Sequence, residues 1–160
     1  MILVVLGTHE LPFTRLLKAV EQQIEKGNIR EEVIVQTGHT PYNSSKMKLV
    51  KFTSYEDMDQ LYNQASYIVT HGGTGSITSG LKKSKKMIAA PRLVKYGEHN
   101  DDHQLEIVSQ FEATGHLIAW HDGQDFGAAI EKIHSFQPAP FQSGRKDILS
   151  LIESFIEENV

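Results

Sequence analysis

The chain has 160 residues and no cysteine, with a net charge of −4, 39% hydrophobic residues and 22% charged residues. This length and composition are typical of one soluble globular domain with a core of its own. The acidic balance argues against a general nucleic-acid binder, and the lack of cysteine excludes a disulfide scaffold and a thiolate metal site while fitting a reducing compartment.

The first segment, Met1–Leu6, is continuously apolar, as expected for a strand covered on both faces. No positively charged region precedes it, and it ends at Gly7, so it is too short for a signal peptide or a membrane span. No other segment approaches about 18 consecutive apolar residues. We therefore expect a chain that does not cross a membrane by itself.

Short apolar runs alternate with helical patterns along the rest of the chain. The expected strands are Met1–Leu6, Glu32–Gly38, Leu49–Phe52, Tyr67–Thr70, Met87–Pro91 and Leu117–Trp120. The expected helices lie near residues 13–24, 54–66, 77–85, 101–114, 125–136 and 145–159. This alternation predicts βαβ units in a single α/β domain over residues 1–160, with a Rossmann-like, mostly parallel sheet of about six strands flanked by helices.

The last predicted helix, residues 145–159, carries an apolar stripe. Ile148, Leu151, Ile152, Phe155 and Ile156 make up this stripe. The stripe predicts packing against the helix's own domain, and contact with a partner protein is the alternative.

In an open parallel sheet, ligands bind outside the carboxyl ends of the strands. The loops expected at that edge contain much of the chain's glycine, threonine, serine and histidine. These loops cover residues 7–11, 36–40, 52–55, 71–76 and 92–103. Among them, "GTHE" and "QTGH" are weak signals alone and gain value from sharing an edge with the glycine loop described next.

The stretch "HGGTGS", residues 71–76, joins a predicted strand to a predicted helix. Bare backbone N–H groups and the positive end of a helix dipole favour a phosphate at such a place, and Thr74 and Ser76 add hydroxyl donors. The stretch is neither a Walker A motif nor a good dinucleotide fingerprint, since its spacing fits neither. It predicts a phosphate site, with a tight turn that needs positive φ as the alternative.

The stretch "EHNDDHQ", residues 98–104, places His99 and His103 four residues apart with Asp101 and Asp102 between them. Such spacing can hold a metal on one helix face, but the glutamate of an H-E-x-x-H motif is missing. We favour a polar loop that enters a helix, with Asp101 or Asp102 as the N-cap. His103 and Gln104 would then offer hydrogen bonds to a ligand.

Four segments, "VVLGTH", "VIVQTGH", "SYEDMDQLYNQASYIVTHGGTGSI" and "AAPR…GEHNDDHQLEI", together resemble a known family. In order and spacing they are similar to the C-terminal, donor-binding half of GT-B glycosyltransferases of the family 28 type. The likeness extends over about residues 1–120 and is greatest to split-subunit members. These members include the catalytic subunit of the dolichol-linked N-acetylglucosaminyltransferase and bacterial exopolysaccharide and capsule subunits.

The resemblance implies a UDP-sugar site. The diphosphate would lie against residues 71–76, namely His71, Gly72, Gly73, Thr74, Gly75 and Ser76. The Gly7–His9 turn, with Gly7 and Thr8, would face the same diphosphate or the sugar, and Gly38 would belong to the same donor site. Phe52 and Thr53 would border the uracil through main-chain hydrogen bonds, and His103 and Gln104 would contact the sugar, with Asn100 nearby. Much of the family binds the ribose hydroxyls with an acidic residue where this chain has Ser79. A serine can bond one hydroxyl but cannot accept from two as a carboxylate does.

A GT-B enzyme works between two domains, and this sequence matches only one. The resemblance therefore implies a separate, membrane-associated partner subunit that binds a lipid-linked acceptor and supplies the general base, with His9 as the candidate on this chain. The chain itself would be cytoplasmic and recruited to the membrane through that partner. Backbone donors can stabilise the leaving diphosphate, so we expect no required metal or cofactor.

Two other functions are compatible with the residues. A non-catalytic nucleotide-sugar-binding or regulatory subunit is favoured by Ser79. A small free-standing hydrolase is disfavoured, because the chain has no cysteine and no clear Ser-His-Asp arrangement.

Overall fold

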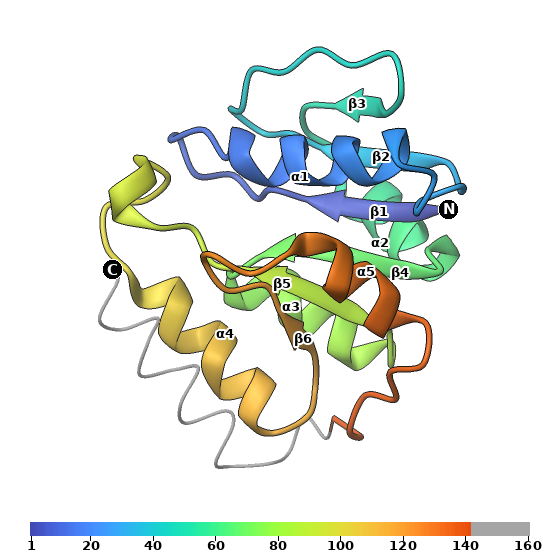
Figure 1. The fold of residues 1–160 in the computed structure, drawn as a ribbon, viewed down its shortest axis with the longest axis vertical. Coiled ribbons are helices and arrows are strands. Elements are labelled where there is room, and N and C mark those ends of the chain that lie inside the picture. The colour runs from blue at the N-terminus through green and yellow to red at the C-terminus, as the bar shows by residue number, and fades with distance from the viewer. Residues whose placement is uncertain (142–160) are drawn as a thin grey trace.

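The computed structural model describes residues 1–141, which form one parallel sheet with helices on both faces (Figure 1). The strands are β1 (Ile2–Val5), β2 (Val33–Gln36), β3 (Lys48–Val50), β4 (Tyr67–His71), β5 (Met87–Ala90) and β6 (Ile118–Ala119). The helices are α1 (Thr14–Glu25), α2 (Tyr55–Gln64), α3 (Thr74–Lys82), α4 (His103–Ala113) and α5 (Phe126–Ile133), with a short 3₁₀ helix η1 (Val94–Tyr96).

The strand order is β3-β2-β1-β4-β5-β6, and every neighbouring pair is parallel. The chain builds outward from β1 to β3, then returns to β4 on the other side of β1. This reversal makes a topological switch point between β1 and β4, the place where open α/β sheets bind ligands. The loops after these two strands therefore form the first place to look for a site.

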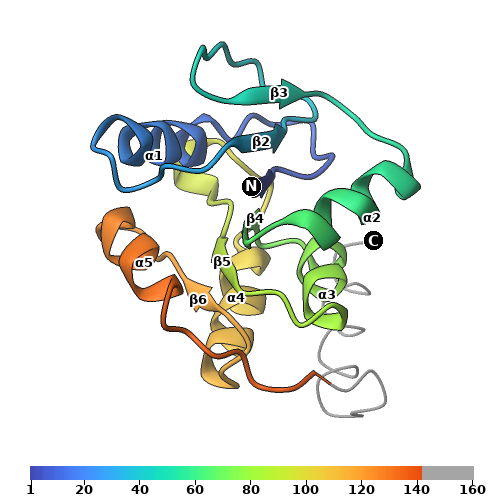
Figure 2. The same ribbon diagram turned by 90° about the vertical axis from the view of Figure 1, so that its right-hand side faces the viewer.

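Two apolar layers hold the helices on the sheet. One layer joins α1 and α5 to one face, with Phe13, Leu16 and Ile130 in its core. The other joins α2, α3 and α4 to the opposite face, where Ile77 and Val108 are fully buried. Figure 2 shows α1 and α5 on one side of the strands and α2 and α3 on the other. The strands read as apolar runs because both of their faces are covered.

The predicted fold class and the six predicted strands are confirmed. Helix α5 ends at Ile133, three residues before its predicted end at Phe136. Helix α3 begins at Thr74 and ends at Lys82, whereas the sequence pattern placed it near residues 77–85. Thr74, Gly75 and Ser76 give no apolar periodicity, so the first turn of the helix reads as loop. The predicted last helix, residues 145–159, lies outside the described residues.

None of the helices described within residues 1–141 is long and apolar enough to cross a membrane.

Candidate functional site

A pocket of about 260 Å³ opens at the carboxyl edge of the sheet, beside the switch point. Its walls come from the loop after β1, the segment that leads from β3 into α2, and the first turns of α3. The lining residues are Val5, Gly7, Thr8, Gln36, Phe52, Thr53, Ser54, Tyr55, Met58, Tyr62, Gly75, Ser76 and Ser79. The structure thus brings together Gly7, Thr8, Phe52, Thr53, Gly75, Ser76 and Ser79 of the predicted site.

The three glycines of residues 71–76 have different surroundings. A Cβ atom on Gly72 would lie 2.8 Å from the Gln104 Cβ, and one on Gly73 would lie 2.3 Å from the His71 ring. A Cβ atom on Gly75 would meet nothing within 4 Å. The chain's own packing therefore accounts for the first two glycines, and Gly75 alone leaves its backbone open to a ligand.

The tight-turn explanation of these glycines is wrong, because none of the three has a positive φ. Gly73 is the N-cap of α3 with extended backbone, and Gly75 lies within the first turn. The backbone N–H groups in the first turn of α3 are open and are aligned with the helix dipole. They therefore offer a binding place for an anion.

His71 is at the end of β4, where it supports the glycine loop from behind. Its Nε2 lies 3.1 Å from Ser76 Oγ and its Nδ1 lies 3.2 Å from Gln104 Nε2. Burial, with a smaller contribution from the nearby Arg92 cation, lowers the pKa of His71 to about 3. The ring is therefore neutral at physiological pH and positions Ser76 at the pocket wall.

Gln104 ties the glycine loop to the segment after β5. Its side-chain oxygen accepts hydrogen bonds from the Gly72 N–H at 2.9 Å and the Arg92 N–H at 3.1 Å. The side chain is buried, so the amide predicted to contact the sugar is engaged within the protein. Its contribution in this structure is to fix the two loops relative to one another.

Arg92 is a component of the site that sequence reasoning missed. Its guanidinium is only 1% exposed and donates to the backbone oxygens of Leu6 at 2.6 Å, Leu11 at 2.7 Å and Glu98 at 3.0 Å. It thereby joins the loop after β1 to the loop after β5. An arginine that directly follows a buried strand was the available signal, since such a charge needs internal partners.

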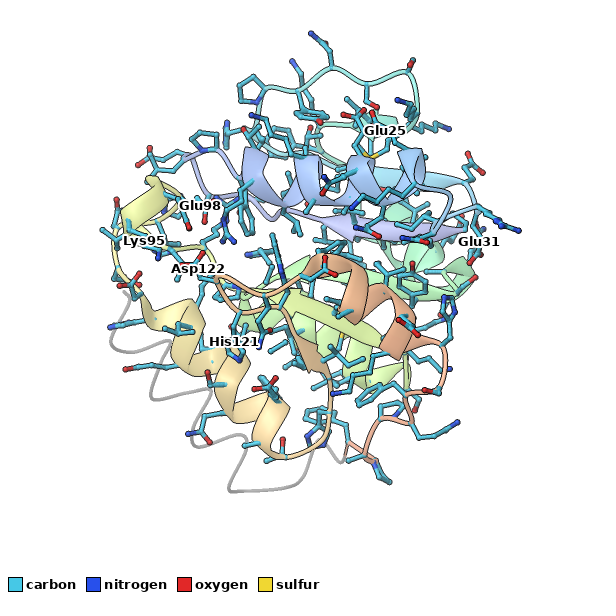
Figure 3. The ribbon with its side chains drawn as sticks, viewed as in Figure 1. Glu25, Glu31, Lys95, Glu98, His121 and Asp122 are labelled. Carbon is cyan, nitrogen blue, oxygen red and sulfur yellow. The ribbon has the colours of Figure 1, made fainter. Side chains whose placement is uncertain are left out.

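A second arginine, Arg15, forms an ion pair at the carboxyl edge of the sheet. Arg15 donates two hydrogen bonds to the Glu98 carboxylate, at 2.9 and 3.0 Å, and Glu98 is buried. Glu98 and Lys95 lie at the same end of the sheet in Figure 3, and Glu31 lies at the other. Arg15 thereby neutralises the buried Glu98 carboxylate, and Arg92 binds the backbone carbonyl of the same residue.

Gln36 shapes the pocket floor and was also missed. Its side chain accepts from the Gly7 N–H at 2.9 Å and donates to the Gly7 carbonyl at 2.9 Å. Gly7 and Gly38 both have positive φ, and a Cβ on Gly38 would lie 2.3 Å from the Gly7 carbonyl oxygen. Gly38 therefore lies behind the pocket and lets the two loops approach closely. The sequence signal that could have identified Gln36 was a polar side chain at the end of a buried strand.

The far end of the pocket carries aromatic and hydroxyl groups. Phe52 and Tyr55 are 54% and 85% exposed, so they offer free flat faces. The Thr53 Oγ1 atom is buried and has no hydrogen-bond partner within residues 1–141. Ser79 donates its hydroxyl proton to the Gly75 carbonyl at 2.8 Å, which leaves its oxygen free to accept. A planar base with a hydroxylated sugar would match these groups.

The remaining predicted residues lie outside this pocket. Asn100 is exposed on the segment before α4, and His103 is the first residue of α4 with its Nδ1 buried and unpartnered among the described residues. Thr74 opens α3, and its carbonyl accepts from the Thr78 hydroxyl at 2.8 Å. Asp102 is the N-cap of α4, but its carboxylate bonds the Val94 N–H and makes no cap hydrogen bond.

The metal alternative gains no support from the geometry of residues 1–141, which contain no group of three or more histidine, aspartate or glutamate residues placed to hold an ion.

Residues 1–158 match the family described as the glycosyltransferase family 28 C-terminal domain. The chain belongs to this family. The family 28 chain is also 34% identical over 74 residues to the UDP-N-acetylglucosamine transferase subunit ALG13 of Eremothecium gossypii. That alignment covers 46% of this chain and 34% of the relative, so the chain spans about a third of the relative's length. The predicted family resemblance is confirmed.

Solved structures share the fold of this family 28 domain. The NMR structure of ALG13 matches 97% of this chain and 96% of its own, with a TM-score of 0.59 and 19% identity. The kitacinnamycin glycotransferase matches with a TM-score of 0.57 and 17% identity, and only 40% of it is covered. Acinetobacter baumannii MurG matches with a TM-score of 0.53 and 12% identity over 49% of its length. The GT-B, Rossmann-like architecture is thus confirmed.

Proposed function

We propose that this domain binds a UDP-sugar as the donor subunit of a hexosyltransferase. The observation that carries the proposal is the open backbone at Gly75, where a helix N-terminus meets the pocket. The family and the name of the Eremothecium relative, a UDP-N-acetylglucosamine transferase subunit, support a nucleotide-sugar as the ligand.

The pocket suggests how UDP would lie. The uracil would rest against Phe52 and Thr53, and the ribose would lie beside Ser79. The diphosphate would then reach the first turn of α3 at Gly75 and Ser76. When the bond between the sugar and the diphosphate breaks, negative charge grows on the leaving group, and backbone N–H groups stabilise it without a metal ion.

The other half of the enzyme is proposed to be a separate protein. ALG13, whose name calls it a subunit, has a fold that this chain matches over nearly its full length, whereas the larger glycosyltransferase structures carry additional chain. We propose a membrane-associated partner that binds a lipid-linked acceptor, supplies the general base and recruits this chain from the cytoplasm, in polysaccharide or glycolipid synthesis.

The test of the proposed function is a calorimetric titration of the purified chain with UDP, UMP, UDP-GlcNAc, UDP-Glc and UDP-Gal. We expect UDP to bind about tenfold or more tightly than UMP, because the second phosphate adds contacts to the α3 N-terminus. Binding should persist in EDTA. A chain that binds none of these ligands contradicts the proposal.

A non-catalytic nucleotide-sugar-binding subunit is the second candidate, and Ser79 is the observation that favours it. Replacing Ser79 by glutamate should tighten UDP binding about fivefold, because a carboxylate accepts hydrogen bonds from both ribose hydroxyls. Ser79→Gln is the neutral control and should show no gain. The gain in affinity should disappear with 2′-deoxy-UDP. An equal gain for that ligand would mean that the ribose does not lie beside residue 79.

A further inference from the structure

Gln36 is the last residue of β2 and lines the pocket, although only 4% of it is exposed. Strand β2 lies between β1 and β3, and the residues that pair with Gln36 on these strands are Val5 and Val50. Past this level both neighbouring strands end, and the chain continues through Gly7 on one side and through Lys51 on the other. Gln36 therefore stands between two segments that become walls of the pocket.

The side-chain amide of Gln36 binds both segments. Its Oε1 accepts the Gly7 N–H at 2.9 Å, and its Nε2 donates to the Gly7 carbonyl at 2.9 Å and to the Lys51 carbonyl at 3.2 Å. The opposite orientation of the amide would set an oxygen against two carbonyl oxygens, so this network fixes the positions of the oxygen and the nitrogen. The side chain thus continues the hydrogen bonding of the sheet beyond the last paired residues, where Gly7 with its positive φ has left the strand.

The donors of this amide are fully used within the protein. A primary amide carries two N–H groups, and the Gly7 and Lys51 carbonyls take both of them. Gln36 therefore has no donor left for a ligand. Its effect on the pocket comes through the two segments that it holds.

The segment at Lys51 carries the surface on which a base would rest. Lys51 directly precedes Phe52, a pocket residue that is 54% exposed. The Lys51 carbonyl accepts the Gly38 N–H at 2.8 Å as well as the Gln36 amide. The hydrogen bonds of Gln36 therefore set the distance between the wall at Phe52 and the wall at Gly7.

We propose that Gln36 is a positioning residue that fixes the width of the pocket and thereby restricts the bound base to a pyrimidine. This inference rests on the proposed UDP-sugar site and adds the residue that determines its base selectivity. With both walls held by one amide, the pocket cannot widen to admit the two-ring base of a purine nucleotide. Without that amide, the segment at Phe52 can move outward, and the preference for the smaller base declines.

Gln36→Glu and Gln36→Met test this role in the whole chain. Glutamate keeps an acceptor for the Gly7 N–H but turns an oxygen toward the two carbonyls, and methionine keeps the length without any hydrogen bond. Both variants should bind UDP about tenfold more weakly than wild type. Their affinity for ADP, measured by competition against UDP, should stay within about threefold of wild type, so that the preference for UDP falls.

Gln23→Met is the matched control. Gln23 is also a buried glutamine, and its side-chain oxygen accepts the Asn28 amide at 2.8 Å outside the pocket. Its replacement should lower stability and leave the ratio of UDP to ADP affinity unchanged. Equal losses of UDP and ADP affinity in the two Gln36 variants would reduce Gln36 to a structural residue and overturn the proposal, and so would wild-type UDP affinity in both.

NMR spectra of the ligand-free chain test the hydrogen bonds of Gln36 separately. Its side-chain N–H protons should exchange slowly with water and show couplings to the Gly7 and Lys51 carbonyl carbons. Fast exchange without such couplings would contradict the positioning role even if UDP binds. If these couplings are present and the wild-type chain binds neither UDP nor ADP, the proposed function fails, and the selectivity role fails with it.

Discussion

Gly75→Asp is expected to weaken UDP binding more than 100-fold without lowering the stability of the fold. The new side chain enters open space, since a Cβ atom at Gly75 has no neighbour within 4 Å. A carboxylate in the first turn of a helix is favourable for the helix dipole, so the folded state does not suffer. The same carboxylate would occupy the proposed diphosphate position and repel its charge, which should cost about 3 kcal/mol of binding.

The measurement pairs calorimetric UDP titration with urea unfolding, and three variants control it. Gly75→Ala should weaken UDP binding less and raise the unfolding free energy by about 0.5–1 kcal/mol, as alanine does in a helix. Thr78→Asp adds the same charge to α3 outside the pocket and should affect binding far less. Gly73→Ala should lower stability instead, since its Cβ would meet the His71 ring. Unchanged UDP affinity in Gly75→Asp would show that the diphosphate does not bind at the N-terminus of α3.

The fold was predictable because each strand is a short, doubly buried apolar run. Such runs, alternating with amphipathic helices, leave few arrangements apart from a parallel sheet with crossovers. The start of α3 was not predictable, because Thr74, Gly75 and Ser76 have no apolar period and their helical state depends on packing. The strand order, with its switch point beside β1, followed from three-dimensional pairing and not from any local signal.

The candidate site was predictable at the level of loops but not of individual roles. The sequence assigned the same ligand contact to Gly72, Gly73 and Gly75, although the Gln104 side chain fills the space beside Gly72 and the His71 ring fills the space beside Gly73. The contact at Gly72 has no local signal, since Gln104 is far along the chain, and the contact at Gly73 depends on the direction in which the His71 ring is held. For the same reason the sequence places His71 and Gln104 against the ligand and gives no sign of their burial. Their burial arises from long-range contacts that residue type and spacing do not encode.

Lowering the pH from 6.5 to 5 is expected to reduce the free energy of unfolding by about 2 kcal/mol, chiefly through His71. The pKa of this histidine is lowered from 6.5 to about 3 in the folded protein, first by burial and then by the Arg92 cation. Above pH 6.5 both states are neutral, and stability does not depend on this group. Below it the unfolded chain binds a proton that the folded chain cannot, which costs about 1.4 kcal/mol per pH unit.

Urea unfolding at pH 7, 6 and 5 measures this slope. The lowered pKa values of His9 and His99 act in the same direction and should add to it. Carboxylates with lowered pKa values, such as Glu21 and Glu31, lose their contribution to stability only below about pH 4.5, so they do not affect the slope between pH 5 and 7.

His71→Gln should flatten the slope of the unfolding free energy by about 1.4 kcal/mol per pH unit, whatever the stability of this variant at pH 7. His39→Gln, which removes a histidine from the exposed surface, is the control and should keep the wild-type slope. A wild-type slope in His71→Gln would mean that His71 is protonated within the fold, and its neutral contact with Ser76 would then be wrong.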